Sequence, residues 1–360
     1  MTALSVLVGF VLGSDVLDVV HLDPTSDLVK ALAIAALVVL LFRDGLEVDG
    51  EMLRTASGPP LRKLALGMPL TAGIVAVVTH VVTDLGWTES FLVGALLSPT
   101  DPVLSSSVVT NPRVPPEIRH SLNLESGLND GLALPPVLAL SAALEIGGDD
   151  FTAWSFVLQD VGLGVLIGVA VALAAALRTP ARGAALYCLA AAGATYGLAV
   201  LAGGNGFIAA FVAAIVLGVR RPELLAAFER REELIVDAVK LGIFFEFGAL
   251  LTVDGLFGDG WAAVAIVAAT LLIARPVAVW IALAGTRLGR DVKAFMAWFG
   301  PKGVATLTFS LLVLGKHIPG NERIFNIAAL AVLTSVVLHG LTDRRGSEWM
   351  ARRAARGGAD

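Results

Sequence analysis

Apolar runs without a charged residue constrain this chain more than any other feature of its sequence. Leu163–Leu177 and Trp261–Ile273 are two of them. Only 16% of the residues are charged, against about a quarter in an ordinary soluble domain. The runs are too numerous for the core of one soluble domain, so the sequence predicts an all-α integral membrane protein.

About twelve apolar segments follow one another along the chain, and most have the roughly 20 residues that a helix needs to cross a bilayer. They lie near Ala3–Val20, Leu28–Phe42, Leu64–Thr83, Ser90–Thr110, Ser121–Leu144, Phe156–Leu177, Gly183–Ala202, Gly206–Val219, Leu234–Leu251, Trp261–Gly285, Ala294–Leu314 and Arg323–Leu341. We expect a single transmembrane domain over residues 1–360 that ends in a basic tail at 343–360.

Lysine and arginine residues are concentrated in alternate loops. Arg43–Lys63, Asn111–His120, Arg178–Arg182, Arg220–Glu233, Arg287–Lys293 and the tail from Asp343 together hold 20 of them, whereas the opposite loops hold only Lys316. Basic loops face the cytoplasm in most membrane proteins. The pattern therefore predicts a multi-pass protein of the plasma (inner) membrane with both termini in the cytoplasm.

The segment Ser90–Thr110 contains the motif Ser98-Pro99-Thr100-Asp101-Pro102 at its middle. Each proline removes a backbone donor and clashes with the preceding turn, so we expect the helix to open and to free carbonyl groups around Thr100 and Asp101. In transporters, unwound backbone at this depth lines ion sites. The alternative is a proline kink in which Asp101 caps the second half of the same helix.

The next segment carries Glu125-Ser126-Gly127-Leu128-Asn129-Asp130. Glu125 and Asn129 are four residues apart and share a helix face, and Ser126 and Asp130 share the adjoining face. Ionisable residues inside a span cost a few kcal/mol unless they are paired or hydrated, which makes them functional candidates. Hydroxyl, carboxylate and carbonyl oxygens are the ligands that hard cations such as Na⁺ prefer.

These two motifs together resemble the monovalent cation/proton antiporter superfamily and, within it, the Na⁺/H⁺ exchangers of the NhaP/NHE branch, whose signature is ESxxND. Trp298–Gly303 is similar to the second unwound helix of that family. The resemblance covers essentially the whole chain. The family pattern has one more span at its N-terminus, so a first transmembrane helix is expected to be missing here.

The resemblance implies an inverted-repeat fold with two crossed, unwound helices. A mobile core bundle, at about 61–146 and 261–342, would slide against a fixed, dimer-forming part at about 3–42 and 156–251. The protein would then be a homodimer in the lipid bilayer.

The resemblance also implies roles for individual residues. The ion and proton ligands would be Asp130, Asp101, Ser126 and the Thr100 main chain, and Glu125 would pair with Arg275, with Asn129 bracing that pair. The second unwound helix would contribute Gly300, Pro301, Lys302 and Gly303. Lys302 stands where the family often has arginine, which keeps the charge and loses the bidentate geometry.

The implied function is secondary antiport for pH and sodium homeostasis, without a cofactor and without enzymatic catalysis. Na⁺ or Li⁺ would compete with H⁺ for Asp130, and because Asn129 carries no proton we expect electroneutral exchange. K⁺ in place of Na⁺ is the main alternative, and a cation channel that uses the same carboxylates is another. The chain has no HExxH motif and no basic cluster beside aromatic residues, so neither a zinc protease nor a nucleic-acid partner is expected.

Overall fold

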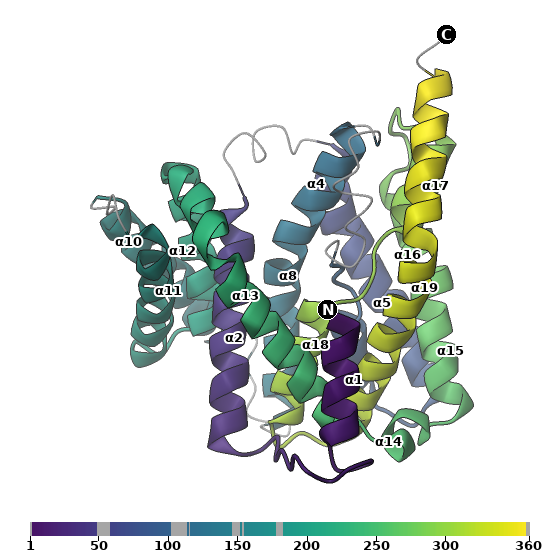
Figure 1. Ribbon diagram of the computed structural model, residues 1–360, viewed down its shortest axis with the longest axis horizontal. Helices are drawn as coiled ribbons and strands as arrows, with labels where there is room; N and C mark the ends of the chain where they lie inside the picture. The colour runs from purple at the N-terminus through teal and green to yellow at the C-terminus, as the bar shows by residue number, and fades with distance from the viewer. Residues whose placement is uncertain are drawn as a thin grey trace. The chain divides into compact units, whose positions relative to one another are not determined.

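The computed structural model describes residues 2–48, 58–101, 114, 116–145, 152, 155–177 and 183–357, and every regular element in these ranges is a helix (Figure 1). The chain divides into two compact units. Unit 1 comprises Met1–Arg54, Asp130–Leu250 and Gly315–His317, and unit 2 comprises Thr55–Asn129, Leu251–Leu314 and Ile318–Asp360. The expected core bundle kept 61–146 together, whereas the boundary between the compact units falls inside helix α8, after Asn129.

Unit 1 is built from helices that pack through small residues. They are α1 (Thr2–Leu12), α2 (Asp27–Leu46), the second half of α8 (Pro116–Glu145), η3 (Phe156–Leu163), α10 (Gly164–Ala176), α11 (Ala184–Leu201), α12 (Gly206–Arg220) and α13 (Glu223–Leu250). In Figure 1, α1 lies beside α13. A Cβ at Gly248 would stand 2.2 Å from the carbonyl oxygen of Val6, so only glycine allows the two backbones this close.

Unit 2 contains the two breaks that the sequence predicts. Its helices are α4 (Pro59–Arg62), η1 (Lys63–Gly67), α5 (Met68–Val82), α6 (Trp87–Leu96), the first half of α8, α14 (Val253–Phe257), α15 (Trp261–Ala269), η4 (Thr270–Ala274), α16 (Arg275–Ala282), α17 (Arg290–Trp298), α18 (Val304–Leu314) and α19 (Asn321–Gly357). Residues 97–101 follow α6 without helical structure, and residues 299–303 separate α17 from α18. Residues 102–110, which complete the predicted Ser90–Thr110 segment, lie outside the described residues.

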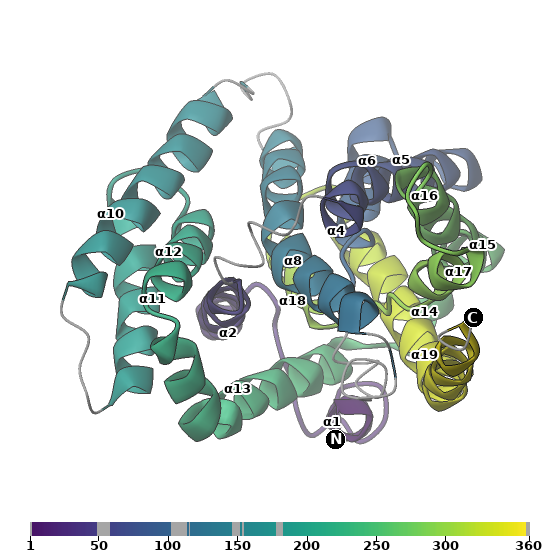
Figure 2. The same ribbon diagram turned by 90° about the horizontal axis from the view of Figure 1, so that it is seen from above.

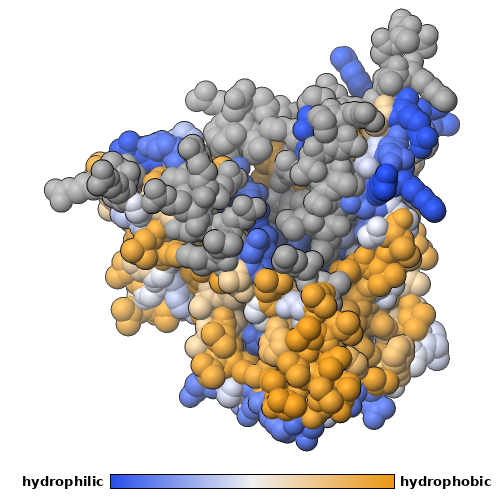
Figure 3. Space-filling view, in the orientation of Figure 1, coloured by the Kyte–Doolittle hydropathy of each residue, from blue (hydrophilic) through white to orange (hydrophobic). Residues whose placement is uncertain are grey.

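The described helices agree with a membrane protein. Each of the twelve predicted segments contains at least one of them, and six stretches are long and apolar enough to cross a bilayer by themselves. Large apolar side chains on the outside of unit 1 are exposed, for example Leu166 (66%) and Leu201 (86%). A soluble protein would bury such leucines, whereas lipid is a favourable surrounding for them. Figure 3 shows hydrophobic residues over much of the face in view and hydrophilic residues along the upper part of α19.

Helix α19 has 37 residues and is tied at both ends within unit 2. Near its start, Arg323 forms ion pairs with Asp84, and with Asp259 at 2.6 Å. Near its end, Arg353 lies 2.5 Å from Asp291 of α17. The basic tail expected at 343–360 is therefore a continuation of this helix as far as Gly357.

Candidate functional site

The two chain breaks of unit 2 cross each other at Asp101. The backbone N–H of Asp101 donates to the carbonyl oxygen of Pro301 at 2.8 Å, and the carboxylate Oδ2 accepts from the N–H of Val304 at 3.1 Å. Asp101 thus caps the first turn of α18, as aspartate does at helix N-termini. The alternative expected from the sequence was that Asp101 caps the second half of the helix in which it lies. In the described residues Asp101 instead caps α18, which begins 203 positions later in the sequence.

Gly303 makes this crossing possible. A Cβ at Gly303 would stand 2.4 Å from both Cβ and Oδ2 of Asp101, which is closer than real Cβ contacts. A larger residue would push the carboxylate away from the N-terminus of α18.

Lys302 lies in the second break and holds the backbone of the first break in place. Its side chain is fully buried, and Nζ donates to the carbonyl oxygens of Pro99 at 3.0 Å and Ser98 at 3.3 Å. These are carbonyl groups that the break after α6 frees, as the prolines predict. A positive charge at the C-terminal end of a helix also interacts favourably with the helix dipole. An ammonium group suits two separate carbonyl acceptors, so the planar fork of arginine is not needed here.

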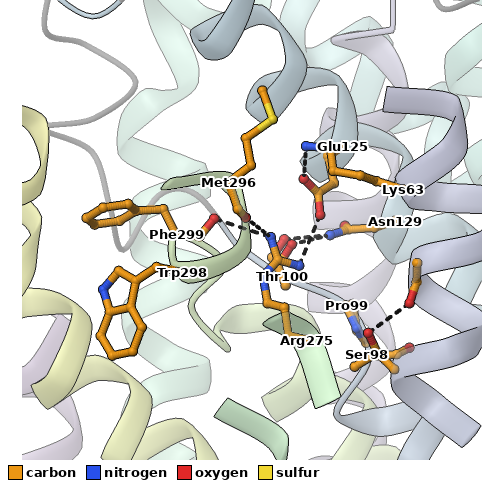
Figure 4. A network of polar contacts seen from close by, with 12 residues as sticks. Lys63, Ser98, Pro99, Thr100, Glu125, Asn129, Arg275, Met296, Trp298 and Phe299 are labelled. Atoms are coloured by element: carbon orange, nitrogen blue, oxygen red, sulfur yellow. Dashed lines mark hydrogen bonds and ion pairs between the residues drawn. The ribbon is translucent and has the colours of Figure 1, made fainter. Parts of the chain in front are cut away.

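Glu125 of α8 binds two buried cations (Figure 4). Its Oε1 lies 3.1 Å from Nη1 of Arg275, which is the predicted ion pair, and its Oε2 lies 2.6 Å from Nζ of Lys63. The sequence analysis counted Lys63 among the basic residues of a loop, yet its side chain is only 1% exposed. The available signal was its position directly before an apolar segment, which does not reveal a partner 62 residues away.

Both cations on Glu125 stand at a junction between a π-helical and an α-helical turn. Lys63 is the first residue of η1, and Arg275 follows directly after η4. A π-helical turn holds one residue more than an α-helical turn, so it changes the direction in which the following side chains point. Such turns occur often at functional sites, and hydrophobic periodicity does not detect them.

Arg275 also joins Glu125 to the second break. Its Nη2 donates to the carbonyl oxygens of Phe299 at 3.2 Å and Met296 at 3.4 Å, at the C-terminal end of α17 (Figure 4). The guanidinium lies against the backbone of Gly300, where a Cβ would stand 1.9 Å from Nε. Glycine is therefore required at this position for Arg275 to reach its three partners.

Asn129 does not brace the Glu125–Arg275 pair in the hydrogen bonds that the structure gives it, which corrects the expectation. Its Nδ2 donates to the carbonyl oxygen of Thr100 at 2.6 Å and to Oγ1 of the same residue at 3.0 Å (Figure 4). Asn129 thus ties α8 to the first break. The physical reason is that Lys63 already occupies the second oxygen of Glu125, so the pair needs no further donor.

The remaining predicted ligands lie on α8. Asp130 is buried and directly follows Asn129. Ser126 lies in the same helix, and its side chain is outside the described residues. A carbonyl oxygen has two lone pairs, so the bond from Asn129 leaves Thr100 with capacity for a further ligand.

The buried charges of unit 2 differ from those expected. The resemblance implied one buried ion pair, between Glu125 and Arg275, and Lys63 was counted in a loop. Among its described residues unit 2 buries three cations (Lys63, Arg275 and Lys302) and two carboxylates (Asp101 and Glu125). The described hydrogen bonds of the lysines and Arg275 go to Glu125 and to backbone carbonyls.

A small pocket adjoins this network within unit 2. It is lined by Lys63, Leu64, Gly67, Met68, Thr71, Ser98, Glu125, Asn129, Arg275 and Val279. Polar side chains from α8 and Ser98 of the first break therefore line one pocket together with both cations that Glu125 binds.

Comparison with known proteins gives one consistent family. The profile described as "Sodium/hydrogen exchanger, transmembrane" matches residues 1–344. The K(+)/H(+) antiporter NhaP2 of Shewanella oneidensis is 26% identical over 317 residues, which cover 85% of this chain and 55% of that protein. The Na(+)/H(+) antiporter NhaG of Bacillus atrophaeus is 28% identical over 280 residues, which cover 70% of this chain and 51% of that protein. The chain thus spans about half the length of these relatives.

A solved structure supports the same fold. The sodium proton antiporter MjNhaP1 from Methanocaldococcus jannaschii, at pH 8, superposes with a TM-score of 0.84. The match covers 97% of this chain and 92% of that chain, at 17% sequence identity. The predicted antiporter fold is therefore confirmed.

Proposed function

This chain belongs to the sodium/hydrogen exchanger family of secondary transporters, and from that membership we propose that it exchanges a monovalent cation for H⁺ across a membrane. The observation that carries the proposal is the crossing of the two chain breaks at Asp101, with Pro301 and Val304 as its partners. A buried carboxylate between two unwound segments is an arrangement in which transporters hold ions at membrane depth.

We assign the exchanged ion to Asp130 and Asp101, with Ser126 and the Thr100 carbonyl as further ligands. The family resemblance supports this assignment, and the contact of Asn129 with Thr100 ties the motif of α8 to the first break. Carboxylate, hydroxyl and carbonyl oxygens form a suitable set for a hard cation.

Exchange follows from the free-energy cost of moving an ionised Asp130 through the membrane. An unneutralised carboxylate moved through hydrocarbon costs several kcal/mol, and either the cation or a proton removes that cost. The cation and H⁺ therefore compete, and the loaded forms cross.

We propose that the exchange is electroneutral. Asn129 has no titratable proton, and Glu125 is held by Lys63 and by Arg275, which stays charged, so we assign the exchanged proton to one site in each cycle. A steady current from reconstituted protein under a cation gradient would contradict this stoichiometry.

We propose Na⁺, with Li⁺ as a second substrate, and K⁺ as the alternative. The ligand types do not distinguish Na⁺ from K⁺, because cavity size decides that preference. The names of the two relatives differ in the same way, since one is a K(+)/H(+) antiporter and the other a Na(+)/H(+) antiporter.

The test is proton movement in everted vesicles that contain a pH-sensitive dye. Addition of Na⁺, Li⁺ or K⁺ should dissipate an imposed proton gradient with the wild type, and Asp130→Asn should abolish the response. Asp254→Asn, outside the proposed site, is the control. Exchange that survives in Asp130→Asn refutes the proposal, and the three cations rank the substrates in the same experiment.

The placement in the membrane is also a proposal. The basic loops support cytoplasmic termini in the plasma membrane, which cysteine labelling from either side would check. We further propose a homodimer with unit 1 at its contact, and cross-linking in native membranes would test it.

A further inference from the structure

Two residues of α19 hold the two ends of the second chain break, and neither has a role in the exchange proposed above. Ser335 and His339 are four residues apart, so they lie on the same face of the helix. Both are buried, with exposed fractions of 0% and 3%. Ser335 contacts Lys302 at one end of the break, and His339 contacts Trp298 at the other end.

His339 contacts the first end of the break through Nε2. This nitrogen lies 3.0 Å from the carbonyl oxygen of Trp298, which accepts a hydrogen bond when Nε2 carries the hydrogen. The two rings also stack, with centroids 5.4 Å apart. Trp298 is tied further to α19 by its indole N–H, which donates to Oγ1 of Thr342 at 3.0 Å.

Ser335 connects His339 with Lys302 by two hydrogen bonds. The backbone N–H of Lys302 donates to Oγ of Ser335 at 2.8 Å, and that Oγ lies 3.1 Å from Nδ1 of His339. When His339 is neutral, the serine hydroxyl donates to Nδ1. When it is charged, Nδ1–H can donate to the Ser335 carbonyl oxygen at 2.9 Å. The bonds to Trp298 and Lys302 persist in both states.

We infer that His339 is a positioning residue for cation binding: together with Ser335 it clamps Trp298 and Lys302 to α19 and so sets the place of Asp101. The link to Asp101 is short. The clamped segment contains Pro301, whose carbonyl oxygen accepts from Asp101, and Gly303, against which the carboxylate packs, follows it directly. The inference rests on the proposed function.

The charged neighbours of His339 are the same cations that organise the site. Lys302 from the break and Arg275 from α16 act electrostatically on the ring. On α19 itself, Asp343 follows one turn later. The clamp and the Glu125 network thus meet at the second break, whose first residue, Phe299, is bound by Arg275 next to Trp298.

The experiment measures exchange in proteoliposomes as a function of cation concentration, for Na⁺ and for K⁺. His339→Leu removes the bond to Trp298 and should raise the half-saturating cation concentration at least about tenfold, which corresponds to about 1.4 kcal/mol of lost binding. His339→Gln can still donate to Trp298 and accept from Ser335, so it should stay within about twofold of the wild type.

Two further variants separate positioning from folding. Ser335→Ala should raise the half-saturating concentration, and the double variant with His339→Leu should show less than the sum of the two effects, because the residues act through one segment. His80→Leu is the matched control, since His80 contacts Leu85 and Trp87 and neither break. It should leave the half-saturating concentration unchanged.

A binding readout covers variants with low activity. Cations should raise the melting temperature of the purified wild type in detergent, and His339→Leu should need higher concentrations for the same rise. An unchanged half-saturating concentration in His339→Leu overturns the inference, as does a Gln variant that is as impaired as the Leu variant. If the wild type neither exchanges nor binds cations, the proposed function fails and the inference fails with it.

Discussion

The ammonium group of Lys63 lies 2.6 Å from Oε2 of Glu125, and both side chains are almost completely buried. Glu125 therefore binds a cation with each of its oxygens, since Arg275 occupies Oε1. A carboxylate with two permanent partners is fixed in place. It serves as the anchor of unit 2, from which α8, η1 and α16 are positioned.

The Lys63 contact predicts a loss of stability on Lys63→Met. Removal of one partner from a buried ion pair costs about 3–5 kcal/mol, and we expect about 3 kcal/mol because Glu125 keeps Arg275. The melting temperature of the purified protein should fall clearly. Lys63→Arg, which keeps the charge, should lose less.

Arg62→Met provides the control for Lys63, because Arg62 is the neighbouring basic residue and its side chain is exposed. Its melting temperature should change much less. If the melting temperature fell equally in the two methionine variants, the buried Lys63–Glu125 pair would contribute no more to stability than the exposed Arg62.

The contact of Gly300 with Arg275 predicts that Gly300→Ala abolishes most of the exchange. The added Cβ would stand 1.9 Å from Nε, so the guanidinium must leave Phe299 or Glu125. We expect the exchange rate to fall at least about tenfold, which corresponds to about 1.4 kcal/mol. The vesicle assay measures this rate.

Gly340→Ala on α19 is the matched control, because a Cβ there meets no atom within 4 Å. Alanine is also a better helix former than glycine by about 1 kcal/mol, so this variant should be at least as stable as the wild type. If both alanine variants exchange at the rate of the wild type, the exchange does not depend on the position of the Arg275 guanidinium.

Asp101 combines a structural role with the proposed binding role, and two substitutions separate them. Asp101→Asn keeps an oxygen that can accept from Val304, so its melting temperature should stay near that of the wild type. Asp101→Ala loses the cap and should be less stable by about 1 kcal/mol. Both should bind the cation more weakly, as measured by cation-dependent melting. An Asn variant with unchanged cation dependence would exclude Asp101 as a ligand.

The Asp84–Arg323 pair predicts a small pH dependence of stability. The hydrogen bond from Arg323 lowers the pKa of Asp84, which lies in the loop after α5. Such a group stabilises the folded state above the unfolded carboxyl pKa, near 4, and loses this contribution as the pH falls through the lowered folded value. Asp84→Asn should therefore melt below the wild type at pH 6, and the difference should shrink below about pH 4. A difference that grows in acid would reverse the assigned sign.

The sequence was sufficient for features that depend on local chemistry. The two prolines beside Thr100 lie three residues apart in the middle of an apolar segment, so the first break was predicted from local chemistry, whereas the second break, at Gly300-Pro301, was expected from the family resemblance. The pairing of Glu125 with Arg275 came from the family resemblance, because no local rule connects two residues 150 positions apart.

The remaining contacts depend on tertiary packing. Lys63 was counted as a loop residue because the charge rule considers sequence position and not the direction of a side chain. The resemblance implied that Asn129 braces the Glu125–Arg275 pair, whereas its hydrogen bonds go to Thr100, 29 residues away in the sequence. No sequence motif surrounds His339, and its contact with Trp298 joins two residues that are 41 positions apart.

The length of helix α19 determines how far it extends beyond the membrane. At 1.5 Å per residue its 37 residues extend for about 55 Å, whereas the hydrocarbon layer is about 30 Å thick. A rod of this length reaches into water beyond the bilayer, and it carries Ser335 and His339 along its middle. The part of this helix that lies in water and the residues that contact Trp298 and Lys302 therefore belong to one continuous helix, so a displacement of one is transmitted to the other.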